Sequence, residues 1–282
     1  MIEFKKGKHT HPSGKKNSLN DFSGSEWAQS SKSIMSYEDT RSKKQRTHGA
    51  SFPQSLVEHQ IQCYTKKGET VLDPFVGVGT TLDACIETKR KGIGMEINSN
   101  FVELAKQDLI VHKKTQKLIC DDVRNILKHI KPNSIDFVIT SPPYANMLQK
   151  IQKKFLYKWK KYGMREKENS KPYSVHPDDI GNLPYEEGLG QLKKILENLL
   201  VVTKNNCYAC WVVKDFRDIK NKKTLIPFHS DLVTIATEAG WKLWDIRIFD
   251  QTRFRPLVIL GIPSRNFYLN IGHSYIITFK KE

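Results

Sequence analysis

The pattern of apolar and polar positions changes at about residue 52 of the chain. From there to residue 144, short apolar runs typical of buried strands alternate with segments whose apolar residues recur at helical spacing. The predicted strands cover residues 70–75, 92–97, 117–120 and 134–140, and the predicted helices cover residues 55–66, 80–89, 98–112 and 123–130. This alternation predicts an α/β domain with right-handed crossovers, a mainly parallel sheet and helices on both faces.

A basic segment interrupts the alternation after Tyr144. Beyond it, the pattern predicts helices at 185–203 and 228–239 and strands at 206–213, 241–249 and 274–279. The first 47 residues are rich in Ser, Lys, Gly and Asn, and they predict a basic, partly flexible arm. We therefore divide the chain into the arm (1–47), one half of the α/β domain (48–145), a basic insertion (146–183) and the second half (184–282).

A glycine-rich turn joins the first predicted strand to the next helix, with the sequence DPFVGVGTT from Asp73 to Thr81. In a parallel sheet such a turn lies at the carboxyl end of a strand, where ligands bind. Gly77 and Gly79 permit positive φ angles and a close approach of the backbone. Glu96 ends the following strand, where a carboxylate can accept hydrogen bonds from both hydroxyls of a ribose. Turn and carboxylate together indicate a nucleoside site.

The turn lacks the residues that bind a pyrophosphate or a triphosphate. Leu82 stands where a dinucleotide fingerprint requires a third glycine, and no Gly-Lys-Ser/Thr sequence is present. A nucleoside with an amino-acid tail, such as S-adenosylmethionine, fits better. Asp122 follows the strand at 117–120, where it can either meet the adenine amino group or cap the helix that begins at Val123, and the two roles are compatible.

The strand at 134–140 continues into Ser141-Pro142-Pro143-Tyr144, a stiff loop at the same edge of the sheet. An exocyclic amino group of a base is a poor nucleophile, because its lone pair is delocalised into the ring. Two acceptors aimed at its N–H bonds, the Ser141 hydroxyl and the Pro142 carbonyl, would favour a tetrahedral nitrogen during attack on a sulfonium methyl. Tyr144 would stack on a base flipped out of the duplex.

With these motifs in this order, residues 48–281 resemble the S-adenosylmethionine-dependent DNA amino-methyltransferases, which methylate cytosine N4 or adenine N6. The resemblance implies a seven-stranded Rossmann-like sheet. It implies a catalytic loop of Ser141, Pro142, Pro143 and Tyr144. It also implies a cofactor site formed by Phe52, Asp73, Pro74, Phe75, Gly77, Gly79, Thr80, Thr81, Glu96, Ile97, Asp122 and Val123.

Two features depart from the family pattern. Val78 stands where many members have serine or threonine, and the cofactor motif precedes the catalytic one, as in a circular permutation that leaves the sheet intact. Ser141 in place of aspartate is typical of cytosine-N4 enzymes, which we favour, with adenine N6 as the alternative. An RNA or protein-glutamine methyltransferase and an inactive DNA-binding relative are the remaining possibilities. Methylation at cytosine carbon 5 is excluded, because no cysteine follows a proline.

The net charge of +16 predicts a polyanionic partner, for which double-stranded DNA is the first candidate. Residues 149–163 contain lysines interleaved with aromatic residues and no acid, a combination suited to phosphates and unstacked bases, although a solvated helix has the same composition. The predicted DNA-binding residues are Lys150, Lys153, Lys154, Lys158, Lys160, Lys161 and Arg165. A cognate restriction endonuclease is a further candidate partner, and the sequence leaves monomer and homodimer open.

Apolar runs and cysteine spacing give expectations about the localisation of the protein and about metal binding. No signal peptide and no run of eighteen apolar residues is visible, so we expect a cytoplasmic protein. The resemblance to the DNA amino-methyltransferases implies a bacterial, archaeal or phage origin. Cys207 and Cys210 have the C-x-x-C spacing of a metal site, but they lie on a predicted strand, where residues three apart face opposite sides. We therefore predict no metal site.

Overall fold

A computed structural model describes residues 17–38, 42, 45, 52–112, 114–144, 179–218, 224–253 and 269–282. Its helices are α1 (Gly24–Ser30), α3 (Gln54–Tyr64), α4 (Thr80–Glu87), α5 (Ser99–Leu109), α6 (Ile126–His129), α8 (Tyr185–Val202) and α9 (Phe228–Glu238). Three short 3₁₀ helices are η1 (Ile110–His112), η2 (Val123–Asn125) and η3 (Ile180–Asn182). The strands are β1 (Ile34–Met35), β2 (Thr70–Asp73), β3 (Lys91–Glu96), β4 (Gln116–Cys120), β5 (Ile135–Thr140), β6 (Thr203–Val213), β7 (Phe216–Asp218), β8 (Thr224–Ile226), β9 (Lys242–Asp250) and β10 (His273–Lys280).

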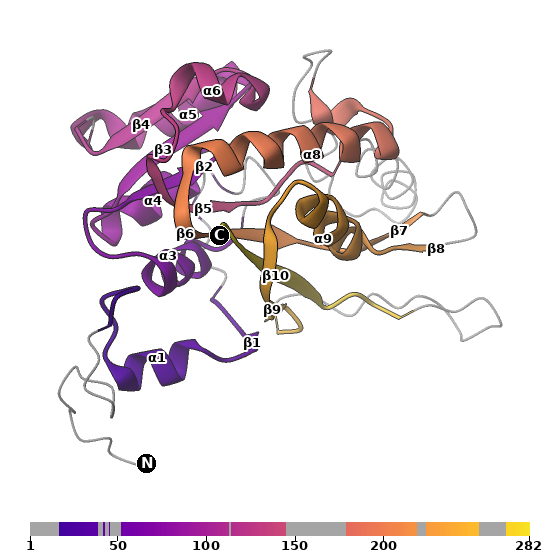
Figure 1. Cartoon of the computed structure of the whole chain (residues 1–282), viewed down its shortest axis with the longest axis horizontal. Coiled ribbons are helices and arrows are strands. Elements are labelled where there is room, and N and C mark those ends of the chain that lie inside the picture. The colour runs from indigo at the N-terminus through magenta and orange to yellow at the C-terminus, as the bar shows by residue number, and fades with distance from the viewer. Residues whose placement is uncertain are drawn as a thin grey trace, which may run out of the picture.

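One large sheet organises the chain, with the strand order β1-β9-β10-β6-β5-β2-β3-β4 (Figure 1). The strands from β6 to β4 run parallel to one another, whereas β10 is antiparallel to both β6 and β9. The predicted mainly parallel sheet of seven strands with helices on both faces is therefore confirmed. The two-residue strand β1 adds an eighth strand by pairing with Ile248 and Phe249 of β9.

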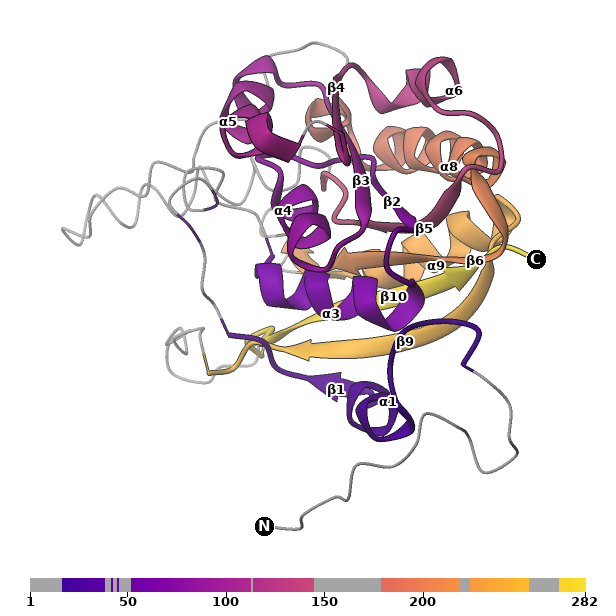
Figure 2. The ribbon, with the colours of Figure 1, turned by 90° about the vertical axis from the view of Figure 1, so that its left-hand side faces the viewer.

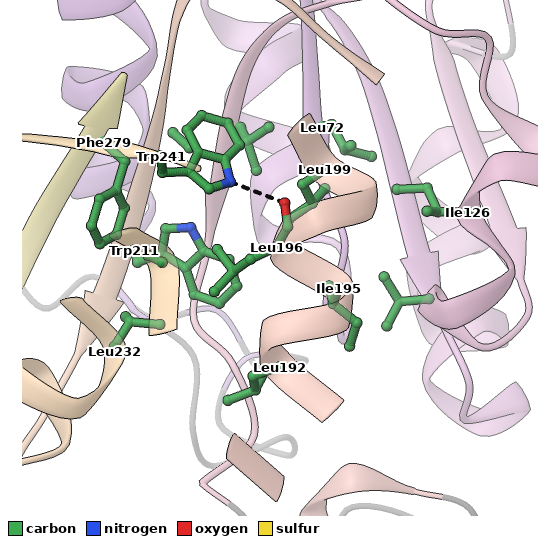
Figure 3. Packing of buried hydrophobic residues seen from close by; sticks show 14 of the residues in the cluster. Leu72, Ile126, Leu192, Ile195, Leu196, Leu199, Trp211, Leu232, Trp241 and Phe279 are labelled. Atoms are coloured by element: carbon green, nitrogen blue, oxygen red, sulfur yellow. Dashed lines mark hydrogen bonds between the residues drawn. The ribbon is translucent and has the colours of Figure 1, made fainter. Parts of the chain in front are cut away.

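Helices cover both faces of this sheet. Figure 2 shows α3 and α4 on the near side, where their apolar residues form a cluster with β2, β5, β6 and β10. On the other side α8 and α9 pack with η2 and α6 in the largest cluster. Trp211 and Trp241 fill its centre, and the Trp241 indole nitrogen donates a hydrogen bond to the Leu196 carbonyl at 3.0 Å (Figure 3). These two layers hold the strand ends in fixed positions at the site described below.

Part of the N-terminal arm lies against the α/β domain. Asn20 is buried and donates a hydrogen bond to the Cys63 carbonyl at 2.7 Å, and Asp21 pairs with the buried Arg90 at 3.0 Å. Tyr37 is 8% exposed and belongs to the cluster on the α3 side of the sheet. These contacts attach the described part of the arm to α3 and to the strand that follows Arg90.

Several sequence expectations fall outside the described residues. The basic insertion is described only from residue 179 onward, so the predicted DNA contacts remain untested predictions. These are Lys150, Lys153, Lys154, Lys158, Lys160, Lys161 and Arg165.

Two smaller expectations can be compared with the described residues. Cys210 is buried and Cys207 partly exposed, as expected for opposite faces of β6. Among the described helices, none has both the length and the apolar character needed to cross a membrane.

Candidate active site

The carboxyl ends of four neighbouring strands, β5, β2, β3 and β4, lie at one edge of the sheet. A cavity opens there, with an empty volume of about 730 Å³ including its mouth, within the range usual for small-molecule sites. Its lining residues are Pro74, Phe75, Met95, Glu96, Ile97, Phe101, Asp121, Asp122, Val123, Ser141, Pro142, Pro143, Tyr144, Asp179 and Ile180. Six of the predicted cofactor residues and the predicted catalytic loop therefore share one space.

Asp73 connects the chain segments that surround this cavity. Its carboxylate is 1% exposed and accepts hydrogen bonds from the Thr81 hydroxyl at 2.5 Å and the Thr140 hydroxyl at 2.6 Å. It also accepts the Phe75 backbone N–H at 3.0 Å. Burial raises the pKa of Asp73 to about 6, although these three donors act in the opposite direction. Asp73 thus ties the end of β2 to α4 and to the last residue of β5, one position before the catalytic loop.

Glu96 reaches into the cavity from the end of β3. One carboxylate oxygen accepts the Gly77 N–H at 3.0 Å, and the other accepts the Asn98 N–H at 2.8 Å. Gly77 has a φ of 54°, so the glycine turn needs the left-handed region to present this N–H. A carboxylate has about four lone-pair sites. Each oxygen of Glu96 therefore keeps one lone-pair site, and its use by a ribose hydroxyl stays a prediction.

The surroundings of Glu96 disfavour its negative charge. Burial raises its pKa to about 7, and the nearby carboxylates of Asp179 and Asp73 contribute in the same direction. The two backbone N–H groups that bond its oxygens lower the pKa and only partly offset these effects. Ligand hydroxyls that donate to Glu96 would stabilise its ionised form.

Asp122 occupies the position expected for it at the end of β4. Its carboxylate accepts the Arg124 backbone N–H at 2.8 Å, so the predicted helix-capping role is confirmed for η2. The Arg124 guanidinium also bonds both carboxylate oxygens, with the shortest distance 2.5 Å. The interaction with an adenine amino group stays a prediction, because Arg124 occupies the oxygens that such a group would approach.

The lining of the cavity is acidic as well as apolar. Glu96, Asp121, Asp122 and Asp179 all contribute to it, and among the described residues no lysine or arginine lines it. Such a lining disfavours phosphates, although Arg124 pairs with Asp122 and burial raises the pKa of Glu96. The sulfonium and ammonium groups of S-adenosylmethionine are both cationic, so these residues fit that molecule better than a dinucleotide.

The catalytic loop forms one wall of the cavity. Ser141 follows Thr140, and the two prolines lead to Tyr144, whose ring packs edge-on against Phe228 with centroids 5.2 Å apart and against Phe216 at 6.1 Å. Tyr144 also borders a smaller apolar space behind the loop, together with Tyr185 and residues of α8. Its ring therefore has a supported position between the two spaces.

The structure separates the predicted cofactor residues into two groups. Pro74, Phe75, Glu96, Ile97, Asp122 and Val123 line the cavity, whereas Asp73, Gly77, Gly79, Thr80 and Thr81 support it from the turn and α4. Phe52 does not line it and packs against the cluster on the α3 side of the sheet. Met95, Phe101, Asp121, Asp179 and Ile180 line the cavity without having been predicted. Asp121, a second acid directly after β4, carried a usable signal, whereas Asp179 lies beyond the basic insertion and carried none.

The cavity at the carboxyl edge of a mainly parallel sheet, lined by acidic residues and by the Ser-Pro-Pro-Tyr loop, has the arrangement expected of a methyltransferase-like α/β protein. Residues 3–107 match a family model described as DNA methylase, which covers N6 and N4 methyltransferases. This match confirms the resemblance to the DNA amino-methyltransferases and the prediction of S-adenosylmethionine as cofactor. It includes the glycine turn and Glu96 and ends before Ser141.

Curated relatives match a short part of the chain. The type II methyltransferase M.HpaI of Haemophilus parainfluenzae is 40% identical over 67 residues, which are 24% of this chain and 21% of the relative. M.MjaI of Methanocaldococcus jannaschii is 40% identical over 65 residues, or 23% of this chain and 22% of the relative. The matched part thus spans about a fifth of these relatives. The crystal structure of TrmN from Thermus thermophilus aligns with 85% of this chain and 53% of its own at 13% identity, with a TM-score of 0.49.

The Glu96→Gln substitution is expected to weaken S-adenosylmethionine binding by about 10- to 100-fold, because it removes charge-assisted hydrogen bonds to the ribose. Wild-type affinity should be full above pH 7 and fall as the pH drops through about 7, where Glu96 becomes protonated. The variant should lack this dependence, since glutamine does not titrate. Calorimetric titration with the cofactor on either side of pH 7 measures both effects.

Glu103→Gln is the matched control, because Glu103 is an exposed residue of α5 that pairs with Lys106. It should leave cofactor affinity and its pH dependence unchanged.

Because the pKa of Glu96 is raised in the folded protein, its contribution to stability is lost as the pH rises through about 7. The free energy of unfolding of the cofactor-free wild type should therefore decrease as the pH rises toward about 7 and level off above it. Wild-type cofactor affinity in Glu96→Gln would contradict the ribose-binding role predicted for Glu96.

Proposed function

We propose that the chain is a DNA methyltransferase that transfers a methyl group from S-adenosylmethionine to the exocyclic N4 amino group of a flipped cytosine in a specific duplex sequence. One observation carries this proposal. The acidic nucleoside site and the Ser-Pro-Pro-Tyr loop line the same cavity, so a bound sulfonium and a base at the loop would be neighbours. The match to the DNA methylase family over residues 3–107 supports the substrate class.

The chain's own residues would bind both substrates and prepare the amino nitrogen. The cofactor supplies an electrophilic methyl group on a positively charged sulfur. Glu96 would hold its ribose, and Ile97, Phe101 and Val123 would pack on its adenine. The Ser141 hydroxyl and the Pro142 carbonyl would accept the two N–H bonds of the target amino group, which makes the nitrogen lone pair available for attack. The amino nitrogen would form a bond to the methyl group as the methyl–sulfur bond breaks with its electron pair on sulfur, and one amino proton would leave to solvent.

The preference for cytosine over adenine depends on Ser141 at the first position of the loop. Incubation with methyl-labelled S-adenosylmethionine and duplex DNA, followed by digestion to nucleosides, separates the two products. We expect the label in N4-methylcytosine. Label in N6-methyladenine would identify adenine as the target base instead of cytosine. Label only in RNA or protein would reject DNA as the substrate. Cofactor binding without transfer to any of these would support an inactive DNA-binding relative.

The Tyr144→Ala substitution is expected to reduce kcat/KM for DNA by about 5- to 150-fold, because stacking on an aromatic ring contributes roughly 1–3 kcal/mol per base. Phe216 and Phe228 hold this ring at the cavity wall. Tyr144→Phe keeps the ring and should retain most of the activity. Cofactor affinity should be unchanged in both variants, and an equal loss of cofactor binding would contradict the stacking role.

The partners of the chain follow from the same proposal. Double-stranded DNA would contact the basic insertion through Lys150, Lys153, Lys154, Lys158, Lys160, Lys161 and Arg165, since cations in this number suit a phosphate backbone. The similarity to type II methyltransferases makes a cognate restriction endonuclease a reasonable partner to seek. Methylation of the recognition sequence would then protect the host DNA.

A further inference from the structure

The described part of the N-terminal arm reaches the glycine turn of the cofactor site. Gln45 is 2% exposed, and its side-chain amide donates a hydrogen bond to the Thr80 hydroxyl at 3.0 Å. Thr80 is 3% exposed and is the first residue of α4, directly after Gly79. A side chain that lies 35 positions earlier in the chain therefore contacts the helix start that follows the turn.

Local hydrogen bonds fix the orientation of the Gln45 amide. Its Oε1 accepts the Ser42 backbone N–H at 2.7 Å, and the Ser42 hydroxyl accepts the Gln45 backbone N–H at 3.4 Å. This reciprocal pair is the arrangement of a capping box. Because Ser42 uses the amide oxygen, the NH₂ group is the end of the side chain that faces Thr80. A rotation of this amide would break the bonds at both ends.

The start of α4 depends on bonds from other segments, because its N-cap residue has no side chain. Gly79 occupies the N-cap position with a φ of 91° and makes no side-chain capping bond. Two consecutive hydroxyls hold the first turn instead. Thr81 donates to Asp73 at 2.5 Å, and Thr80 accepts the bond from Gln45. One bond attaches the helix start to β2 and the other attaches it to the arm.

The position of this helix start affects the backbone of the cofactor site. The Gly79 N–H donates to the Val76 carbonyl at 3.0 Å, which closes the turn. Within the turn, the Gly77 N–H donates to Glu96 at 3.0 Å. A shift of the first turn of α4 would therefore move Gly77 relative to Glu96. The match to the DNA methylase family, over residues 3–107, includes the arm as well as the turn.

We propose that Gln45 is a positioning residue for S-adenosylmethionine: through its bond to Thr80 it holds the glycine turn in the geometry that binds the cofactor. The described part of the arm thereby belongs to the cofactor site. The inference rests on the cofactor site of the proposed function and does not depend on the target base. A merely structural contact would attach the arm to the domain without affecting the cofactor.

The first test is the Gln45→Met substitution, which nearly preserves the length and volume of the side chain and removes its hydrogen bonds. Calorimetric affinity for S-adenosylmethionine should fall about tenfold, the effect usual for one buried hydrogen bond. KM for the cofactor should rise by a similar factor. The value of kcat at saturating cofactor should stay at the wild-type level, because the catalytic loop is untouched. Wild-type cofactor affinity in this variant would overturn the positioning role.

A double-mutant cycle tests whether Gln45 acts through Thr80. Thr80→Val removes the hydroxyl that accepts the bond and should also weaken cofactor binding. If the two residues act through this one bond, adding Gln45→Met to Thr80→Val should cause no further loss. Losses that multiply in the double variant would show that Gln45 does not act through Thr80.

Asn20→Ala is the matched control, because Asn20 is a buried residue of the same arm that attaches it to α3. Asn20 is 3% exposed and donates to the Cys63 carbonyl at 2.7 Å. Its replacement should lower the free energy of unfolding and leave cofactor affinity unchanged. Equal losses of affinity in Asn20→Ala and Gln45→Met would reduce Gln45 to a tether of the arm. Absence of cofactor binding by the wild type would instead reject the proposed function.

Discussion

Replacement of Ser141 by alanine is expected to lower kcat by about 10²–10³-fold, the size usual for the loss of one preorganised hydrogen-bonding group at a reacting centre. Ser141 lines the cavity at the end of β5, where the structure fixes the preceding residue through the 2.6 Å hydrogen bond from Thr140 to Asp73. Without the hydroxyl, only the Pro142 carbonyl would accept an amino N–H. The affinity for S-adenosylmethionine should stay the same, because Glu96 and the apolar residues around it are untouched.

Ser134→Ala is the control for this substitution. Ser134 lies just before β5, at the other edge of the sheet, and its hydroxyl donates to the Lys131 carbonyl at 2.6 Å. Its removal should leave kcat and cofactor affinity at wild-type values. Single-turnover methylation of duplex DNA measures the chemical step directly. A wild-type rate in Ser141→Ala would show that the hydroxyl does not assist the reaction.

The Gly79→Ala substitution is expected to lower the free energy of unfolding by about 2–3 kcal/mol and to weaken cofactor binding by more than about tenfold. Gly79 precedes α4 with a φ of 91°, a conformation that L-residues rarely adopt. A Cβ at this position would also lie 3.1 Å from the Cβ of Ala105 on α5. The turn would have to move, and with it Gly77, whose N–H bonds Glu96.

Gly190→Ala provides a matched control with the same change. Gly190 lies inside α8, and an added Cβ would meet no atom within 4 Å. Alanine there should raise the free energy of unfolding by roughly 0.5–1 kcal/mol, because glycine is unfavourable inside a helix. Chemical denaturation and calorimetric cofactor titration distinguish the two variants. Wild-type stability and cofactor affinity in Gly79→Ala would show that the glycine turn does not contribute to the cofactor site.

The sequence predicts the regular part of the fold well. The strands β2 to β5 were placed within about two residues of their observed bounds, because short apolar runs bounded by turn residues leave little choice of position. Strand β1 was missed, since two residues have no periodicity and their pairing with β9 depends on tertiary contacts. The hairpin of β7 and β8 was missed for the same reason, with three residues in each strand.

The site was predictable as far as it depends on motifs that follow single strands. Glu96, Asp122 and Ser141 line the cavity, as expected for residues within two positions of the carboxyl end of a predicted strand. Asp179 reaches the cavity through the path of the chain after the basic insertion, which no local pattern indicates. The pairing of Arg124 with Asp122 could not be predicted from the sequence either, because it depends on the rotamer of a long side chain.

The central claim is that this chain methylates an amino group of a base in duplex DNA through the Ser141–Tyr144 loop. Sequencing that detects modified bases, applied to the genome of a host that expresses the wild type or Ser141→Ala, tests it most directly. We predict N4-methylcytosine within one short recurring sequence in the wild-type host, and strongly reduced methylation at those sites with the variant. An unmodified genome in the wild-type host, or equal methylation with both proteins, would contradict the account.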